Sequence, residues 1–170
     1  MELSNKFFED QFNRKANSFM SFTLFAKSLY LSGKTLYKKF SDDLTFLENG
    51  VDPKELPYLD VFFIYLMLYG LAIENLLKSL IIKNGTSLYQ NGVINKRYRT
   101  HNLNSLFDSC GLKKSNDEKE ILDILSEFVL WAGKYSVPSK IQDMKKLFSP
   151  AKQLIVPEKL YERLLSEVEK

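Results

Sequence analysis

An uninterrupted apolar run is the feature that most constrains what this chain can fold into. Residues 61–73 are all apolar, aromatic or glycine, and they lead directly into Glu74, Asn75 and Lys78. A helix that is apolar almost all round needs neighbours on several sides. We therefore expect residues 56–85 to form the central helix of a bundle, with its charges acting either as a site or as a structural clamp.

The same run is too short for a membrane span, which needs about 20 apolar residues. Extending it to Ile82 would place Glu74 and Lys78 in the hydrocarbon. The N-terminal segment has acids and amides where a secretory signal needs a basic start and an apolar core. The single cysteine, Cys110, excludes an intrachain disulfide. These features predict a cytoplasmic protein without a membrane partner.

Length and composition predict one helical domain. A chain of 170 residues fits a single domain, and 45% hydrophobic content with seven Gly and five Pro argues against disorder and against a turn-rich β architecture. We expect residues 1–170 to form one unit, with a core at 17–138 and accessory helices at 139–170. The formal charge of +3 is too small to demand a nucleic-acid partner, and it permits one if the cations cluster.

Apolar side chains recur at helical spacing between Asn17 and Phe46 and predict a long amphipathic first helix. Asn49-Gly50 should end it, and Pro57 suits the first turn of the central helix. Residues 86–100 carry an Asn-Gly turn signal and no helical stripe, so we expect an exposed loop there.

Two shorter helices should follow that loop. Thr100 or Asn102 is a suitable N-cap for a helix over residues 103–110. Ser115 and Glu118 have the spacing of a capping box, in which each side chain bonds the other residue's backbone N–H. They should open the fourth helix.

The end of the chain predicts further helical turns. Residues 133–138 should end the fourth helix, residues 139–148 favour another amphipathic turn or two, and Pro157 should open a last helix. The predicted fold class is all-α, an up-and-down bundle of four to five main helices with short accessory helices.

Glu74 and Lys78 lie four residues apart and should pair on the central helix. One interpretation is an exposed ion pair that contributes a few tenths of a kcal/mol. The other is that Glu74 is partly buried among Ile73, Leu76 and Leu77 and accepts hydrogen bonds from a basic residue on another helix, because a buried carboxylate needs partners.

His101 is the only histidine, so a site built on several histidines is excluded, and no cysteine cluster replaces it. We expect neither a metal nor a cofactor. The imidazole is suited either to a structural hydrogen bond at a helix N-terminus or to general acid and base catalysis.

A basic segment precedes this histidine. Lys96, Arg97, Tyr98 and Arg99 bring three cations and an aromatic ring next to His101. Cations neutralise phosphates and aromatic rings stack on bases, so the segment is a candidate single-stranded RNA contact. The alternative is an ordinary solvated loop. No glycine-rich phosphate loop or serine elbow is present.

Three short motifs resemble those of HEPN domains, over roughly residues 60–138. They are Glu74-Asn75-Leu76-Leu77-Lys78 on the apolar helix, Thr100-His101-Asn102-Leu103 at the start of a short helix, and Trp131-Ala132-Gly133-Lys134-Tyr135 at the end of the next. The resemblance implies an all-α bundle, often a homodimer, with an RNA-related role in prokaryotic stress, antiphage defence or toxin–antitoxin systems. Many such proteins are ribonucleases, and others are partners of nucleotidyltransferases.

In the active members an Arg and a His separated by four to six residues cleave RNA without metal. Counting back from His101, the four-residue spacing falls on Lys96, while Arg97 and Arg99 lie closer. Lysine lacks the planar fork with which a guanidinium grips a phosphate. The closing motif reads Gly-Lys-Tyr-Ser where similar sequences read Gly-Arg-Tyr-Pro.

The same motifs also predict a structural polar network. Glu74, Lys78, His101, Lys134 and Tyr135 could converge inside the bundle, which would leave the imidazole unavailable for chemistry. We expect this network in preference to catalysis.

Three functions remain open. The leading one is a dimeric HEPN-like protein that binds RNA or a cognate nucleotidyltransferase or antitoxin through or beside Lys96, Arg97, Tyr98 and Arg99. The second is a metal-independent ribonuclease that uses His101 with Lys96, Arg97 or Arg99. The third is an interaction module whose aromatic-rich first helix packs against a second copy.

Overall fold

The computed structural model describes residues 5–132, 134, 135, 142 and 157–170. Over these residues the chain is mostly helical, which confirms the predicted all-α bundle. The α-helices are α1 (Asn5–Ala16), α2 (Phe19–Glu48), α3 (Phe62–Lys83), α4 (Leu103–Asp108), α5 (Asn116–Glu127) and α7 (Glu158–Glu169). Shorter elements are the 3-10 turns η1 (Pro53–Glu55) and η2 (Leu59–Val61), the π-helical turn η3 (Phe128–Ala132), and the strands β1 (Tyr89–Gln90) and β2 (Val93–Ile94).

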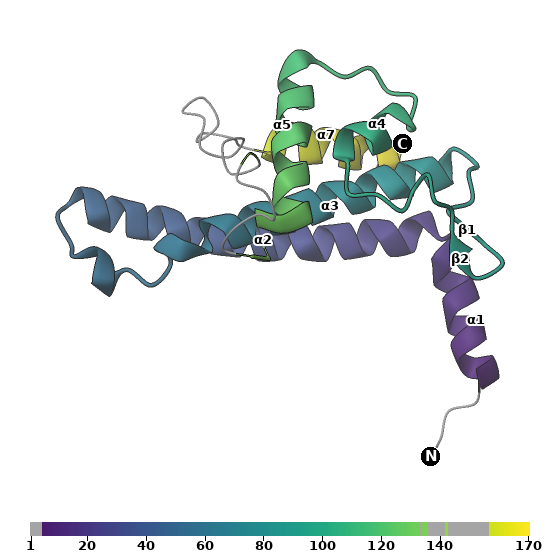
Figure 1. The fold of residues 1–170 in the computed structure, drawn as a ribbon, viewed down its shortest axis with the longest axis horizontal. Helices are drawn as coiled ribbons and strands as arrows, with labels where there is room; N and C mark the ends of the chain where they lie inside the picture. The colour runs from purple at the N-terminus through teal and green to yellow at the C-terminus, as the bar shows by residue number, and fades with distance from the viewer. Residues whose placement is uncertain (1–4, 133, 136–141, 143–156) are drawn as a thin grey trace.

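Two long helices form the frame of the molecule. Figure 1 shows α2 and α3 running side by side in opposite directions, with α5 standing across them. Helices α4 and α7 lie on the same side of the frame as α5, and both pack against α3. Helix α1 turns away from the start of α2. Because α2, α4, α5 and α7 all contact α3, this helix is the central one, as its apolar sequence predicts.

Two glycines let the helices approach closely. A Cβ at Gly33 of α2 would lie 3.1 Å from the ring of Tyr69 on α3. A Cβ at Gly70 of α3 would lie 2.5 Å from Cγ2 of Val129 and 3.1 Å from the carbonyl oxygen of Leu125. Gly70 is therefore the contact point at which α5 and η3 cross α3.

A small buried cluster of hydroxyl groups also joins α2 to α3. The hydroxyl oxygens of Thr23 and Ser79 lie 2.7 Å apart, and each lies 2.8 Å from the carbonyl oxygen of Phe19. One hydroxyl donates to the other, and the second donates to the carbonyl oxygen. The cluster satisfies its polar groups internally, so it is tolerated in the core.

Several predicted boundaries are confirmed. The predicted first helix is α2, which ends at Glu48 with Asn49 as its C-cap, and Gly50 follows with a φ of 87°. Asn102 caps α4, and Ser115 and Glu118 form both hydrogen bonds of the capping box. Local side-chain chemistry thus identifies these helix ends.

Other boundaries differ from the prediction. The central helix begins at Phe62 rather than near Pro57, because the 3-10 turns η1 and η2 lie between α2 and α3. The carboxylate of Asp43 accepts a hydrogen bond from the Tyr58 backbone N–H and holds this connection against α2. Helix α1 is an additional element. The predicted turns over residues 139–148 lie outside the described residues, apart from position 142.

The predicted loop over residues 86–100 contains a short antiparallel hairpin. Tyr89 pairs with Ile94, and Gln90 pairs with Val93. Asn91 and Gly92 form the turn with φ angles of 50° and 75°, the left-handed backbone that an Asn-Gly pair favours. Asn17 lies between α1 and α2. Its side-chain amide donates to the backbone carbonyl oxygen of Tyr89 and accepts from the Tyr89 backbone N–H.

Among the described residues, one helical segment, Leu59–Lys83, is long and apolar enough to cross a membrane. The core helix of a soluble protein passes the same test of length and composition. Here the neighbouring helices bury many of its apolar side chains, and Glu74 and Lys78 lie within it. The cytoplasmic location stays a prediction.

Candidate nucleic-acid interface around His101

Glu74 is the anchor of the candidate site. It lies on α3 between core residues and is only 5% exposed. Its Oε1 accepts a hydrogen bond from Nζ of Lys78 at 2.6 Å, and its Oε2 lies 2.9 Å from Nδ1 of His101. The predicted burial of Glu74 is confirmed, and the interpretation of an exposed ion pair is wrong; the predicted basic partner on another helix is His101, which precedes α4. One partner comes from the same helix and the other from the segment before α4.

The backbone around His101 is fixed on both sides. The hydroxyl of Thr100 accepts a hydrogen bond from the Asn102 N–H at 3.1 Å, and the Asn102 side chain caps α4 by accepting from Ser105. The next N–H, that of Leu103, donates to the hydroxyl of Ser126 on α5 at 3.0 Å. These bonds place the imidazole beside α3 at a defined position.

The imidazole remains accessible to solvent. Its side chain is 45% exposed, whereas those of Glu74 and Lys78 are 6% and 12% exposed. The prediction that a polar network would make His101 unavailable for chemistry is therefore wrong. A carboxylate only accepts hydrogen bonds, so Nδ1 carries the proton and Nε2 is the ring nitrogen left for other partners.

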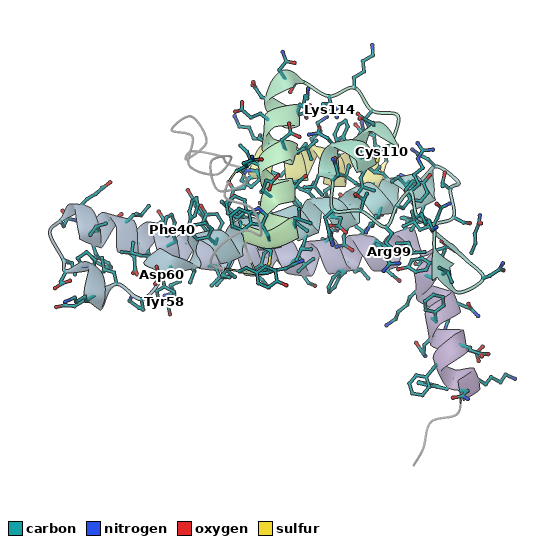
Figure 2. All side chains as sticks on the ribbon, viewed as in Figure 1. Phe40, Tyr58, Asp60, Arg99, Cys110 and Lys114 are labelled. Atoms are coloured by element: carbon teal, nitrogen blue, oxygen red, sulfur yellow. The ribbon has the colours of Figure 1, made fainter. Side chains whose placement is uncertain are left out.

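The basic segment reaches His101 through a turn organised by Asn95. The Asn95 side chain accepts a hydrogen bond from the Arg97 N–H, and its carbonyl oxygen accepts from the N–H groups of Tyr98 and Arg99. The side chains of Lys96, Arg97 and Arg99 are exposed. Figure 2 shows Arg99 at the end of the molecule that carries the hairpin and the start of α2.

Tyr98 does not serve as the predicted stacking platform. Its side chain is 7% exposed and belongs to the hydrophobic core. The guanidinium of Arg97 lies over its ring at 5.7 Å and also contacts the hydroxyl of Ser109 at 3.4 Å. Tyr98 therefore supports Arg97 from beneath, and the RNA-facing role predicted for its ring is corrected to a structural one.

Lys134 and Tyr135 do not join the predicted network. Both are exposed just after η3, and the backbone N–H of each donates to the carbonyl oxygen of Trp131. Over the described part of the chain, the side-chain hydrogen-bond partners of Glu74 are Lys78 and His101. The polar network thus contains three of the five residues expected.

Sequence reasoning missed two supporting residues. Ser126 holds the N-terminus of α4 from α5, a contact between distant segments that no local pattern indicates. The Asn95 side chain forms an Asx-turn with the backbone N–H of Arg97. An asparagine in a loop is only a weak sequence signal for such a turn.

The lone cysteine has no reactive environment. Cys110 is buried, and burial raises the pKa of its thiol to about 12. A thiol is the weak form of a cysteine nucleophile, so the burial of Cys110 argues against covalent catalysis by this residue. Among the residues that the structure describes, no group of three or more His, Cys, Asp or Glu side chains is arranged to hold a metal ion.

The arrangement thus combines an oriented, accessible imidazole with three exposed cations on one short segment. Comparisons with protein-family models, with curated proteins and with solved structures give no match to this chain.

Proposed function

We propose that this chain is a HEPN-like protein that binds single-stranded RNA through the basic segment, defined as residues 96–101. The observation that carries the proposal is the exposure of Lys96, Arg97 and Arg99 next to a half-exposed His101. Cations neutralise the phosphate charge and release counterions, and this release drives sequence-independent binding.

The support beneath the basic segment favours binding over a merely solvated loop. Arg97 is held by the Tyr98 ring and by Ser109, and the backbone is fixed by Asn95. A cation whose side chain is already ordered loses less conformational entropy when it meets a phosphate. The motifs that resemble HEPN domains support the same ligand class and a bacterial stress or defence role.

The test is RNA affinity as a function of salt. Fluorescence anisotropy with a short labelled single-stranded RNA should show binding that weakens steeply between about 50 and 200 mM salt. The double variant Arg97→Ala with Arg99→Ala should bind about tenfold more weakly or worse. Its slope of log affinity against log salt should fall by about 1.4, since each phosphate contact to a single strand contributes about 0.7.

A matched control removes the same charge elsewhere. Lys54 in η1 and Lys159 near the start of α7 are exposed, and both elements lie far from the basic segment in the sequence. Lys54→Ala with Lys159→Ala should keep most of the affinity. Equal losses in the two double variants, or an affinity that ignores salt, would sink the proposal.

A second candidate function is favoured by the Glu74–His101 contact. A carboxylate on Nδ1 fixes the tautomer of an imidazole and stabilises the cation that forms when Nε2 takes a proton. Here Nε2 of His101 would take the proton of an RNA 2′-hydroxyl. The 2′-oxygen then forms a bond to phosphorus, the bond to the 5′-oxygen breaks, and that oxygen takes a proton from water. The neighbouring Arg97, Arg99 and Lys96 would stabilise the added negative charge on the phosphate.

This ribonuclease hypothesis has its own test. Incubation with RNA in the presence of a metal chelator should give products with 2′,3′-cyclic phosphate ends. His101→Ala should abolish them while circular dichroism and RNA binding persist. Undiminished cleavage by His101→Ala would eliminate the hypothesis and leave the binding proposal intact.

A further inference from the structure

The outward face of α2 carries an apolar surface that the fold leaves uncovered. Met20, Leu24, Phe25 and Leu31 are each 58% to 62% exposed. On a helix these positions lie within roughly half a turn of one another, opposite the face that packs on α3. We call the outward face of α2 over residues 20–35 the α2 stripe.

The polar residues of the α2 stripe are adapted to contact with another surface. Ser28, Ser32 and Thr35 each donate their hydroxyl hydrogen to the carbonyl oxygen four residues earlier, at 3.0 to 3.2 Å. Each hydroxyl is therefore already hydrogen-bonded within α2, so removing water from it costs little free energy. Their small size also permits the close approach of another helix.

The two lysines at the border of the α2 stripe contact groups outside it. Lys27 reaches back to Glu169 of α7 at 2.8 Å, and Nζ of Lys34 lies 5.9 Å from the centre of the Tyr30 ring. Over residues 20–35 these lysines are the charged residues of α2, so the α2 stripe itself contains none. An uncharged face over more than four turns is unusual for a helix that faces water.

The apolar surface continues onto α1. A groove of about 690 Å³ between α1 and α2 is lined by Phe12 and Ala16 on one side and by Phe22, Leu24 and Phe25 on the other. It joins the apolar face of α1 to the α2 stripe. Figure 1 shows α1 projecting from the rest of the molecule at this end.

The combined area matches one side of a stable protein interface. Taking about 200 Å² for a large apolar side chain, the exposed parts of the four stripe residues with Phe8 and Phe12 amount to roughly 670 Å². The largest apolar patch on a typical monomer measures about 300 to 600 Å². A standard interface buries about 800 Å² on each partner.

We propose that a second copy of this chain covers the α2 stripe, with the two α2 helices antiparallel about a two-fold axis near Ser28. This pairing is self-complementary. It sets Phe25 of each copy opposite Leu31 of the other, which pairs two apolar side chains. It also sets Leu24 opposite Ser32, which pairs a large side chain with a small one. A two-fold axis needs only one surface that fits itself. The proposal is independent of the RNA-binding function.

The first test is the mass of the full chain in solution. Sedimentation or light scattering should give twice the chain mass of 19.8 kDa. Leu24→Glu with Leu31→Glu should halve the mass without changing the circular dichroism spectrum. The matched control is Leu130→Glu, because Leu130 is 56% exposed on η3, away from the α2 stripe, and this variant should stay dimeric. A monomeric wild type, or a dimer that survives the double variant, would overturn the proposal.

The second test checks the axis. In Ser28→Cys, the two introduced thiols would lie across the two-fold axis, and a disulfide forms only when the Cβ atoms lie about 3.5 to 4.5 Å apart. The native Cys110 is buried and does not interfere. Mild oxidation should yield a covalent dimer from Ser28→Cys and little from Thr45→Cys, which lies beyond the stripe. Equal yields from both positions, or none from Ser28→Cys, would rule out antiparallel pairing at Ser28.

Discussion

Glu74 and Glu118 are two carboxylates held in the same way, and they differ in what their partners can do. Glu118 accepts from the Ser115 N–H and pairs with Arg163 of α7, while Glu74 accepts from Lys78 and contacts His101. A guanidinium keeps its proton at all accessible pH values, so the Glu118 pair only holds elements together. An imidazole has a second ring nitrogen that can take up or donate a proton, so the same anchoring at Glu74 leaves a group able to react.

Arg163, the charged partner of Glu118, also makes other contacts within the fold. The second nitrogen of the Arg163 guanidinium donates to the carbonyl oxygen of Lys113 at 2.7 Å, and the group lies over the ring of Phe107 at 5.8 Å. His101, in contrast, has one ring nitrogen on Glu74 and stands nearly half exposed. The difference between the two sites is therefore the open side of the imidazole.

The largest expected effect on stability comes from Glu74→Ala. The change leaves the ammonium of Lys78, whose side chain is 12% exposed, without its partner. Removing one member of a buried ion pair costs about 3 kcal/mol or more. Urea denaturation should show this loss in the free energy of unfolding. Glu74→Gln, which retains a hydrogen-bond acceptor, should lose less, and a wild-type midpoint for Glu74→Ala would contradict the assignment of Glu74 as the anchor.

A smaller effect is expected at the second carboxylate. Arg163→Ala removes the bonds to Glu118 and Lys113 and the contact with Phe107. Because Arg163 is 36% exposed, solvent screens the pair, and the loss should be about 1.5 kcal/mol. RNA affinity should not change, since Arg163 lies on α7. A fall in affinity as large as that of Arg97→Ala with Arg99→Ala would show that the two carboxylate sites are not separate.

Acid should weaken the Glu118 site. Partial burial acts to raise the pKa of Glu118, but the hydrogen bonds from Arg163 and from the Ser115 N–H outweigh it and lower the pKa below its usual value. The carboxylate therefore stabilises the fold above the unfolded pKa of about 4.3, and this contribution is lost as the pH falls through the folded pKa. The stability gap between wild type and Glu118→Gln should narrow from pH 6 toward pH 3.5, as urea midpoints at each pH would show. A constant gap would contradict this account.

Contacts between residues close together in the sequence can be predicted from it, whereas contacts between distant segments cannot. The Ser115–Glu118 capping box and the Asn102 cap depend on residues three positions apart, and both are found from the sequence alone. The burial of Glu74 follows from its apolar neighbours on the central helix. Its contact with His101 joins segments 27 positions apart and rests on the motif order rather than on a physical rule.

The errors have physical causes of the same kind. Tyr98 lies in a basic, turn-rich segment, where local composition predicts exposure, but its ring packs on the core. The helix before Lys134 ends in five residues of π-helical geometry, Phe128–Ala132, whose wider turn departs from the α-helix that the sequence predicts. The network prediction relied on the order of the motifs and on polar groups at helix ends, and neither of these fixes the side on which Lys134 and Tyr135 lie.

The smallest effect on stability, and the sharpest test of the comparison, is His101→Ala. His101 is 45% exposed, and Glu74 keeps Lys78 when the imidazole is removed. The free energy of unfolding should therefore fall by only about 0.5 to 1 kcal/mol, the range of a typical hydrogen bond. If the imidazole reacts with RNA, cleavage should vanish in this stable variant, while Glu74→Gln, which loosens the imidazole, should retain a reduced rate. If His101 has only a structural role, as Arg163 has beside Glu118, the loss of stability should approach the roughly 1.5 kcal/mol expected for Arg163→Ala, and RNA cleavage and binding should not depend on the imidazole.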